Sequence, residues 1–203
     1  AVGSEARRDA RVCECCQTSA AMSAAGPLVV FRDRSQDEVR DISIVRRVDG
    51  VWTAPRPVFR DGWKIAGCPV NGPSVAASGR HVVVGWFTGA DNTGRVKFAR
   101  STDAGASFGE PSLIDRGNPI GRVEVVVAED GAAWVCWMTR TDDGAAVRAR
   151  RVAADNTLSE AVTIAETEAA RRNGFPQVVR CGGRLVFAWT NQGVQVASMP
   201  LPK

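Results

Sequence analysis

Four cysteines form the densest group of chemically reactive side chains in this sequence. Cys13, Cys15 and Cys16 lie together near the start of the chain, and Cys68 opens a second short segment, Cys-Pro-Val-Asn-Gly-Pro. Thiols at this density can oxidise to a disulfide, or they can bind a soft metal ion such as Cu(I) or Zn²⁺ as thiolates. Buried thiols with neither role are a third interpretation, and all three stay open at this point.

A second group combines basic and acidic residues. The run Phe31-Arg-Asp-Arg34 leaves an apolar segment and enters a polar loop, and Arg40 and Asp41 follow it. Asp33 is a candidate general acid. The structural interpretation is simpler, because Arg32 with Asp41, or Asp33 with Arg40, would form an ion pair across a hairpin.

Strands must position these side chains, because a hairpin pattern recurs along the sequence. Each of four segments has a short strand, a turn containing glycine and an apolar strand that ends in an aromatic residue. These aromatics are Phe31, Trp86, Trp137 and Trp189, which are 55, 51 and 52 residues apart. A regular period of this length predicts a solenoid or a propeller.

The segments that follow each hairpin become more polar. Third strands are expected at 39–47, 94–100, 146–152 and 194–198, and short fourth strands at 55–59, 111–114 and 161–164. Apolar inner strands and polar outer strands are typical of a propeller blade. We therefore predict an all-β protein: a β-propeller of four-stranded antiparallel blades in one domain, 1–203. The four expected blades span 16–60, 72–115, 122–165 and 174–200. A β-sandwich is the competing architecture, but it does not require the period.

One turn carries a recognisable motif. The segment Ser101-Thr-Asp-Ala-Gly-Ala-Ser-Phe108 has the form Ser-x-Asp-x-Gly-x-x-aromatic. Asp103 can accept backbone hydrogen bonds, Gly105 can supply a positive φ, and Phe108 can pack between outer strands. This is the Asp-box of BNR repeats, and the chain resembles the sialidase (neuraminidase) superfamily and related Asp-box propellers. The resemblance implies that Ser101 and the other motif residues are structural and lie on the side of the blade away from an active site.

The resemblance also implies ligand-binding residues. Arg32 resembles the early sialidase arginine that grips a substrate carboxylate in a bidentate manner. Arg122 and Arg172 precede inner strands and are positional candidates for further arginines, and Arg40 adds to the basic set. Sialidases attack with a tyrosine activated by a glutamate, whereas this chain contains no Tyr. We therefore expect a catalytically incomplete, sialidase-like propeller that binds a carbohydrate or a small acidic ligand at its mouth.

Two alternative functions remain. A glycoside hydrolase that uses only carboxylates would need two carboxyl groups facing one mouth, and Asp33 with Glu124 or Asp61 is the first pair to consider. A thiolate propeller that binds Cu or Zn through the four cysteines described above is the other alternative.

The repeat brings two of the cysteines into register. When the first two hairpins are aligned on Gly26 and Gly79, Cys15 matches Cys68, so both should lie near one mouth of the propeller. A disulfide from Cys15 or Cys16 to Cys68 would join neighbouring blades and would favour an oxidising location, periplasmic or secreted. Cys136 is expected in the core.

The remaining features limit the class of partner. Sialidases have six blades, so the resemblance requires further blades, self-association, or closure of the ring by the segment Ala6–Val12. The net charge of +4 is spread along the chain as single arginines, without the basic and aromatic clusters of a nucleic-acid binder. No apolar run approaches the roughly 18 residues that a membrane helix requires.

Overall fold

The computed structural model describes residues 6–170 and 173–201. These residues form four antiparallel sheets and one short 3-10 helix, η1 (Ala90–Asn92), so the predicted all-β propeller architecture is confirmed. No helix among the described residues is long and apolar enough to cross a membrane.

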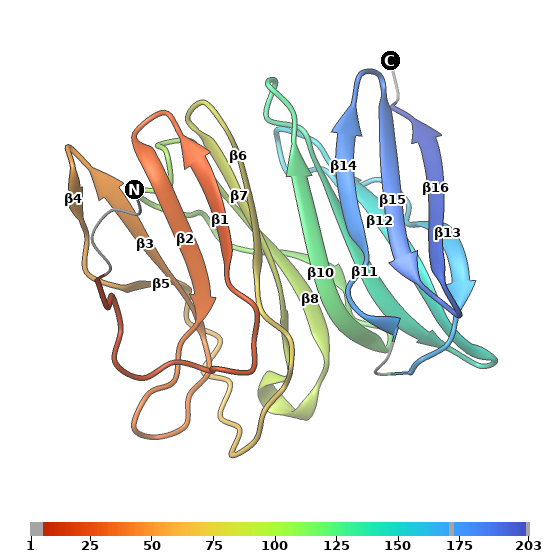
Figure 1. Ribbon diagram of the computed structural model, residues 1–203, viewed down its shortest axis with the longest axis horizontal. Helices are drawn as coiled ribbons and strands as arrows, with labels where there is room; N and C mark the ends of the chain where they lie inside the picture. The colour runs from red at the N-terminus through yellow and green to blue at the C-terminus, as the bar shows by residue number, and fades with distance from the viewer. Residues whose placement is uncertain (1–5, 171–172, 202–203) are drawn as a thin grey trace.

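The sheets follow one another along the chain as blades (Figure 1). Blade 1 contains β1 (Ser19–Ser23), β2 (Gly26–Arg32), β3 (Ile42–Val48), β5 (Arg56–Phe59) and the two-residue β4 (Val51–Trp52). Blade 2 contains β6 (Ser74–Ser78), β7 (His81–Thr88), β8 (Arg95–Ser101) and β9 (Ser112–Asp115). Blade 3 contains β10 (Pro119–Val127), β11 (Ala133–Thr141), β12 (Gly144–Val152) and β13 (Val162–Thr167). In blade 4 the described residues form β14 (Gln177–Cys181), β15 (Arg184–Thr190) and β16 (Val194–Pro200), without a fourth strand among them.

The core lies between blades rather than inside them. Because successive strand residues point to opposite faces, each sheet offers an apolar surface to both of its neighbours. Leu28, Val30 and Ile44 of blade 1 pack against Val84 and Trp86 of blade 2. Similar clusters join blade 2 to blade 3 and blade 3 to blade 4. Each blade therefore buries its apolar side chains only by packing against the next blade.

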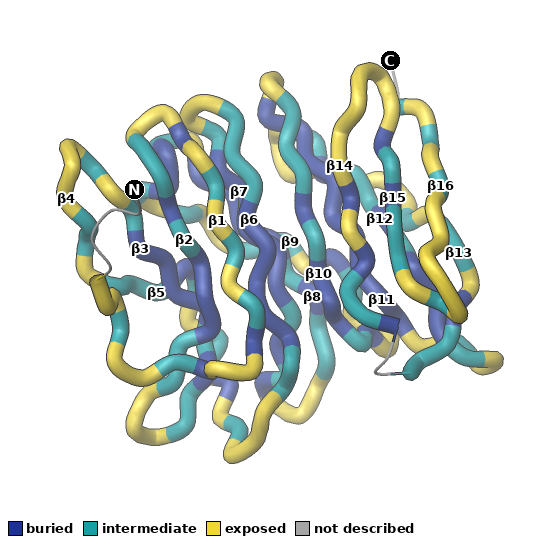
Figure 2. Tube along the Cα trace, viewed as in Figure 1, coloured by how far each residue is buried: buried dark blue, intermediate teal, exposed yellow. Residues whose placement is uncertain are grey.

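The four blades form an open array. β6 lies between β1 and β10, and β10 contacts β14, while blades 1 and 4 lie at opposite ends of the molecule (Figure 1). The segment Ala6–Val12 does not close the ring at blade 4, because Val12 bridges to Asp33 and the Cys13 N–H donates to the Arg32 carbonyl at 2.9 Å. Residues 6–18 instead run along blade 1. Blade 4 consequently has many exposed residues (Figure 2).

The face of blade 4 that points away from blade 3 shows what the open array leaves uncovered. One position of the third strand lies opposite the residue that follows the terminal aromatic of each hairpin. Its occupants in the four blades are Ile42, Val96, Val147 and Val194. The first three are at most 1% exposed, whereas Val194 is 76% exposed. Val194 thus occupies a core position of the repeat that no described residue covers.

The turn with the Asp-box sequence is held by its own side chains. Ser101 Oγ donates to Asp103 Oδ1 at 2.6 Å and accepts the Gly105 N–H at 2.9 Å, while Asp103 Oδ1 also accepts the Ser107 N–H at 2.8 Å. Gly105 has a φ of 78°, which favours glycine, and Phe108 packs onto the cluster between blades 1 and 2. The turn is thus a structural element, at the end of the blades opposite the cysteines.

Candidate functional site

Asn71 connects three blades at the end of the molecule where the cysteines lie. Arg32 Nε donates to its carbonyl oxygen at 2.7 Å, and the Arg122 backbone N–H donates to its Oδ1 at 2.7 Å. Its Nδ2 donates to the Ile120 carbonyl at 3.1 Å. A Cβ at Gly121 would lie only 2.4 Å from Asn71 Oδ1, so the close approach requires glycine there. Sequence reasoning missed Asn71, although an Asn between Pro-Val and Gly-Pro is itself a turn signal.

Arg32, the candidate carboxylate ligand, is directed inward by this arrangement. It is 2% exposed, and besides Asn71 it donates to the carbonyl oxygens of Arg40 at 2.5 Å and Phe87 at 2.7 Å. Its guanidinium also lies 4.9 Å from the centre of the Trp63 ring. Burial lowers the pKa of Arg32. Its N–H groups therefore join blades 1 and 2 through backbone carbonyls.

The charged residues near Arg32 do not form the expected ion pairs across the hairpin. Arg40 forms its ion pair with Glu38 at 2.7 Å, and Arg34 pairs with the same carboxylate at 2.9 Å. Hydrogen bonds from Arg34, then Arg40, lower the pKa of Glu38 to about 2. Asp33 accepts the Arg34 backbone N–H and the Ser43 hydroxyl. These groups form a structural network around the loop after β2.

The two partners considered for Asp33 differ in environment. Asp61 accepts hydrogen bonds from Trp86 Nε1 at 2.6 Å and from Lys97 Nζ at 2.5 Å, and its side chain is 2% exposed. Glu124 lies on β10, the innermost strand of blade 3, and burial raises its pKa to about 7 against the opposing hydrogen bond from Ser74. Glu124 is therefore a carboxyl group with a pKa near neutrality, while Asp61 is a buried hydrogen-bond acceptor for Trp86 and Lys97.

The four clustered cysteines meet at the start of blades 1 and 2. Cys15 and Cys68 form a disulfide, with their Cα atoms 6.4 Å apart. Cys13 Sγ lies 3.2 Å from Cys16 Sγ and 3.5 Å from Cys15 Sγ, and it accepts a hydrogen bond from Arg40 Nη1 at 3.1 Å. Cys13 and Cys16 have the Cys-x-x-Cys spacing that is typical of paired thiolate ligands. Cys136 is fully buried, in the core cluster between blades 3 and 4.

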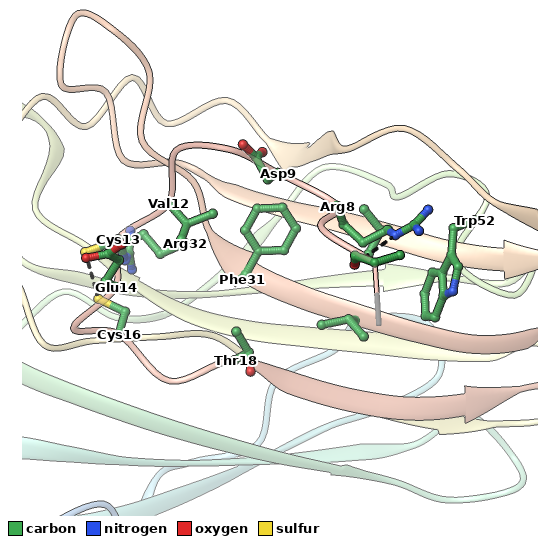
Figure 3. A pocket seen from close by; sticks show the side chains of 13 residues that line it. Arg8, Asp9, Val12, Cys13, Glu14, Cys16, Thr18, Phe31, Arg32 and Trp52 are labelled. Carbon is green, nitrogen blue, oxygen red and sulfur yellow. Dashed lines mark hydrogen bonds between the residues drawn. The ribbon is translucent and has the colours of Figure 1, made fainter. Parts of the chain in front are cut away.

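A cavity of about 570 Å³ adjoins the cysteine cluster. It lies between residues 6–18 and the outward face of blade 1, with Cys13 and Cys16 at one end and Trp52 at the other (Figure 3). Val29, Phe31 and Val45 of blade 1 also line it. Most of its lining is apolar, so it suits an apolar group better than a charged sugar.

A second cavity, of about 320 Å³, lies at the propeller mouth. Asn71, Arg122, Arg140 and Phe175 line it together with apolar residues from the loops between blades. Arg122 donates to the Gly174 carbonyl at 2.7 Å, and its guanidinium lies 5.9 Å from the centre of the Phe175 ring. Arg140 is exposed. The structure thus brings Arg122 to the mouth beside Arg140, which sequence reasoning missed, while Arg172 lies outside the described residues.

Comparisons with known proteins identify the fold. A scan against protein families and a search of curated proteins find no match. Among solved structures, the GH43 protein BlXynB from Bacillus licheniformis matches with a TM-score of 0.58 and 14% identity, over 92% of this chain and 41% of its own. The subtype N10 neuraminidase-like protein of A/little yellow-shouldered bat/Guatemala gives 0.54 and 8%, over 88% and 57%. The fucose-specific lectin from Aleuria aurantia gives 0.53 and 9%, over 90% and 57%.

These likenesses define the class of fold: a β-propeller. More particularly, the chain has a sialidase-like β-propeller fold, as the repeat and the Asp-box motif predicted. The chain spans about half the length of the structures it matches.

Proposed function

We propose that this chain is a catalytically incomplete, sialidase-like propeller that binds an acidic carbohydrate at its mouth. The observation that supports the proposal is the mouth cavity, whose lining residues include Arg122, Arg140, Asn71 and Phe175 and no carboxylate. A cavity with this charge and one aromatic ring favours a ligand that has a carboxylate and an apolar sugar face.

Each lining residue has a distinct role in this proposal. Arg140 presents a planar fork of N–H donors that matches a carboxylate. Phe175 offers a flat apolar surface for a sugar ring, and the buried Arg122 adds positive charge to the cavity lining. The hydrogen bonds of Asn71 hold the floor of the cavity in place before the ligand binds, which reduces the entropic cost of binding.

Three features of the chain support ligand binding without catalytic turnover. The chain has no Tyr, and Asp61 and Arg32 are committed to internal partners. The Cys15–Cys68 disulfide supports a location outside the reducing cytoplasm, in the periplasm or beyond the cell.

Calorimetric titration with N-acetylneuraminic acid, glucuronic acid and galactose tests the proposal. We expect the two acidic sugars to bind and neutral galactose to bind at least tenfold more weakly, with no cleavage of a fluorogenic sialoside. Arg140→Ala should weaken acidic-sugar binding at least tenfold, whereas Arg116→Ala, an exposed arginine outside the cavity, should leave it unchanged. Equal binding by both variants, or turnover of the sialoside, would refute the proposal.

Glu124 supports a second candidate, hydrolysis of glycosides by carboxylates. A carboxylic acid with a pKa of about 7 remains protonated at the pH where a general acid must donate. A panel of nitrophenyl glycosides tests this: release of nitrophenol by the wild-type chain, lost in Glu124→Gln, would establish the hydrolase. No release from any glycoside would eliminate it.

A further inference from the structure

The four sulfur atoms of Cys13, Cys15, Cys16 and Cys68 lie together in an unusual arrangement. The first three Sγ atoms all lie within 4.8 Å of one another, and Cys68 is bonded to one of them. A disulfide that only joined two blades would not need two further thiols beside it. Cys13 and Cys16 are buried, while Cys15 and Cys68 are exposed, so the bond faces solvent and the thiols lie behind it.

Burial raises the pKa of the Cys16 thiol to about 11, so thiolate charge at this cluster requires compensating positive charge nearby. Arg40 Nη1 donates to Cys13 Sγ at 3.1 Å, and the Arg40 side chain is only 6% exposed. Arg32, which is also buried, is held by backbone carbonyls beside the same thiols. Two fixed guanidiniums can offset the negative charge that several thiolates would bring to one metal ion.

From these observations we propose that the four cysteines are a redox-gated site for a soft d¹⁰ metal ion, Cu(I) or Zn²⁺. The Cys15–Cys68 disulfide is the closed state. An external dithiol supplies two electrons and two protons, which cleave the S–S bond to two thiols, and the dithiol leaves as its own disulfide. The metal ion then displaces protons from the four thiols and binds the resulting thiolates.

The geometry of the cluster fits this coordination. Thiolates about 2.3 Å from a tetrahedral Zn²⁺ are roughly 3.8 Å apart, close to the observed Sγ distances of 3.2 and 3.5 Å. Cys15 and Cys68 must separate by about 2 Å to match, which side-chain rotation can supply because their Cα atoms are 6.4 Å apart. The site goes beyond carbohydrate binding and does not depend on it.

Metal titration of the full chain in two redox states tests the proposal. One sample is oxidised in air, and the other is reduced with dithiothreitol and desalted without oxygen. Zn²⁺ and Cu(I) are titrated separately against competing chelators, and Co²⁺ is added as an optical probe, because thiolate coordination gives it intense charge-transfer absorption. We expect one equivalent of metal bound by the reduced chain, at least a hundredfold more tightly than by the oxidised chain.

Variants locate the site. Cys16→Ser, which leaves the disulfide intact, should weaken metal binding by the reduced chain at least tenfold and shift the Co²⁺ spectrum. Cys181→Ser, an exposed thiol in blade 4, is the matched control and should change nothing. Equal binding by both redox states, or loss of binding in Cys181→Ser, would overturn the proposal. Loss of the β-sheet circular dichroism spectrum on reduction would overturn it as well, because the disulfide would then be purely structural.

Discussion

The indole N–H of Trp86 donates to Asp61 Oδ2 at 2.6 Å, and Trp137 repeats this bond to Asp115 Oδ2 at 2.6 Å. In both cases the Trp lies on the second strand of a blade, and the Asp lies at or just after the outer strand of the preceding blade. The bond is therefore a device of the repeat that joins neighbouring blades. Trp189 Nε1 is buried at the corresponding position of blade 4 without an acceptor among the described residues.

Replacing Asp61 should cost far more than replacing Asp115. Asp61→Ala leaves both Trp86 Nε1 and the Lys97 ammonium without their acceptor, so it should lower the free energy of unfolding by about 3–5 kcal/mol. Asp115→Ala removes only the acceptor of the neutral Trp137 indole N–H, so it should lower the free energy of unfolding by about 1–2 kcal/mol. Urea unfolding measures both, with the exposed Asp142→Ala as control. Equal losses would contradict the role of Lys97.

A second bond between blades comes from arginine on the third strand. Arg100 of blade 2 donates to the carbonyl oxygens of Gly131 and Ala153 and to Asn156 Oδ1, all in turns of blade 3, and Arg46 of blade 1 donates to Ala104 of blade 2. We expect Arg100→Ala to lower the free energy of unfolding by about 2–4 kcal/mol.

A lysine variant of Arg100 separates the contribution of charge from that of geometry, and an alanine variant of Arg47 is the control. Arg100→Lys should recover only part of the loss, because an ammonium cannot reproduce the planar fork. Arg47→Ala, one residue from Arg46 and exposed, should stay within about 0.5 kcal/mol of wild type. Full recovery in the lysine variant would show that charge alone stabilises this contact.

The repeat, the strand positions and the Asp-box turn could be predicted because they depend on local patterns. Alternating apolar residues, turn glycines and the sequence Ser101–Phe108 each act within one hairpin. The hydrogen-bond partners of Arg32 could not be predicted. The N–H groups of Arg32 donate to the carbonyl oxygens of Asn71 and Phe87, which are 39 and 55 residues away, and no local pattern encodes such contacts. Arg140 was missed for the same reason, because the cavity it lines exists only once three blades meet.

Asp103 should make stability depend on pH at the acidic end. Partial burial opposes the shift, but hydrogen bonds from Ser101 and Ser107 hold the pKa of Asp103 at about 2, below its usual 3.8. A depressed carboxyl pKa gives stabilisation that is complete above about pH 4 and is lost as the pH falls through 2. Asp103→Asn should therefore be less stable than wild type at pH 7, with the difference shrinking between pH 4 and pH 2 in thermal unfolding. A difference that is constant with pH would contradict this.

Glu124 should make the protein less stable as the pH rises, which is opposite to the effect of Asp103. Burial raises its pKa to about 7, so the folded state binds a proton that the unfolded state has lost, and stability falls as the pH rises from about 4.5 to 7. Glu124→Gln removes the buried charge and should raise the free energy of unfolding at pH 8 by about 2 kcal/mol, with little effect at pH 4. Denaturant titrations at the two pH values measure this. A stabilisation of equal size at both would show that packing, not charge, is responsible.

The open face of blade 4 allows one repeat position to be compared in two environments. Val96 and Val194 are equivalent in the hairpin register, yet Val96 is 0% exposed and Val194 is 76% exposed. Val96→Asp should lower the free energy of unfolding by about 4 kcal/mol or more, because it buries an unpaired carboxylate between blades 2 and 3. Val194→Asp should stay within about 0.5 kcal/mol of wild type, since its side chain already faces water. Thermal unfolding with light scattering checks both variants. If Val194→Asp proved as damaging as Val96→Asp, this face would be covered in solution, and a lower molar mass for the variant would identify the cover as a second copy of the chain.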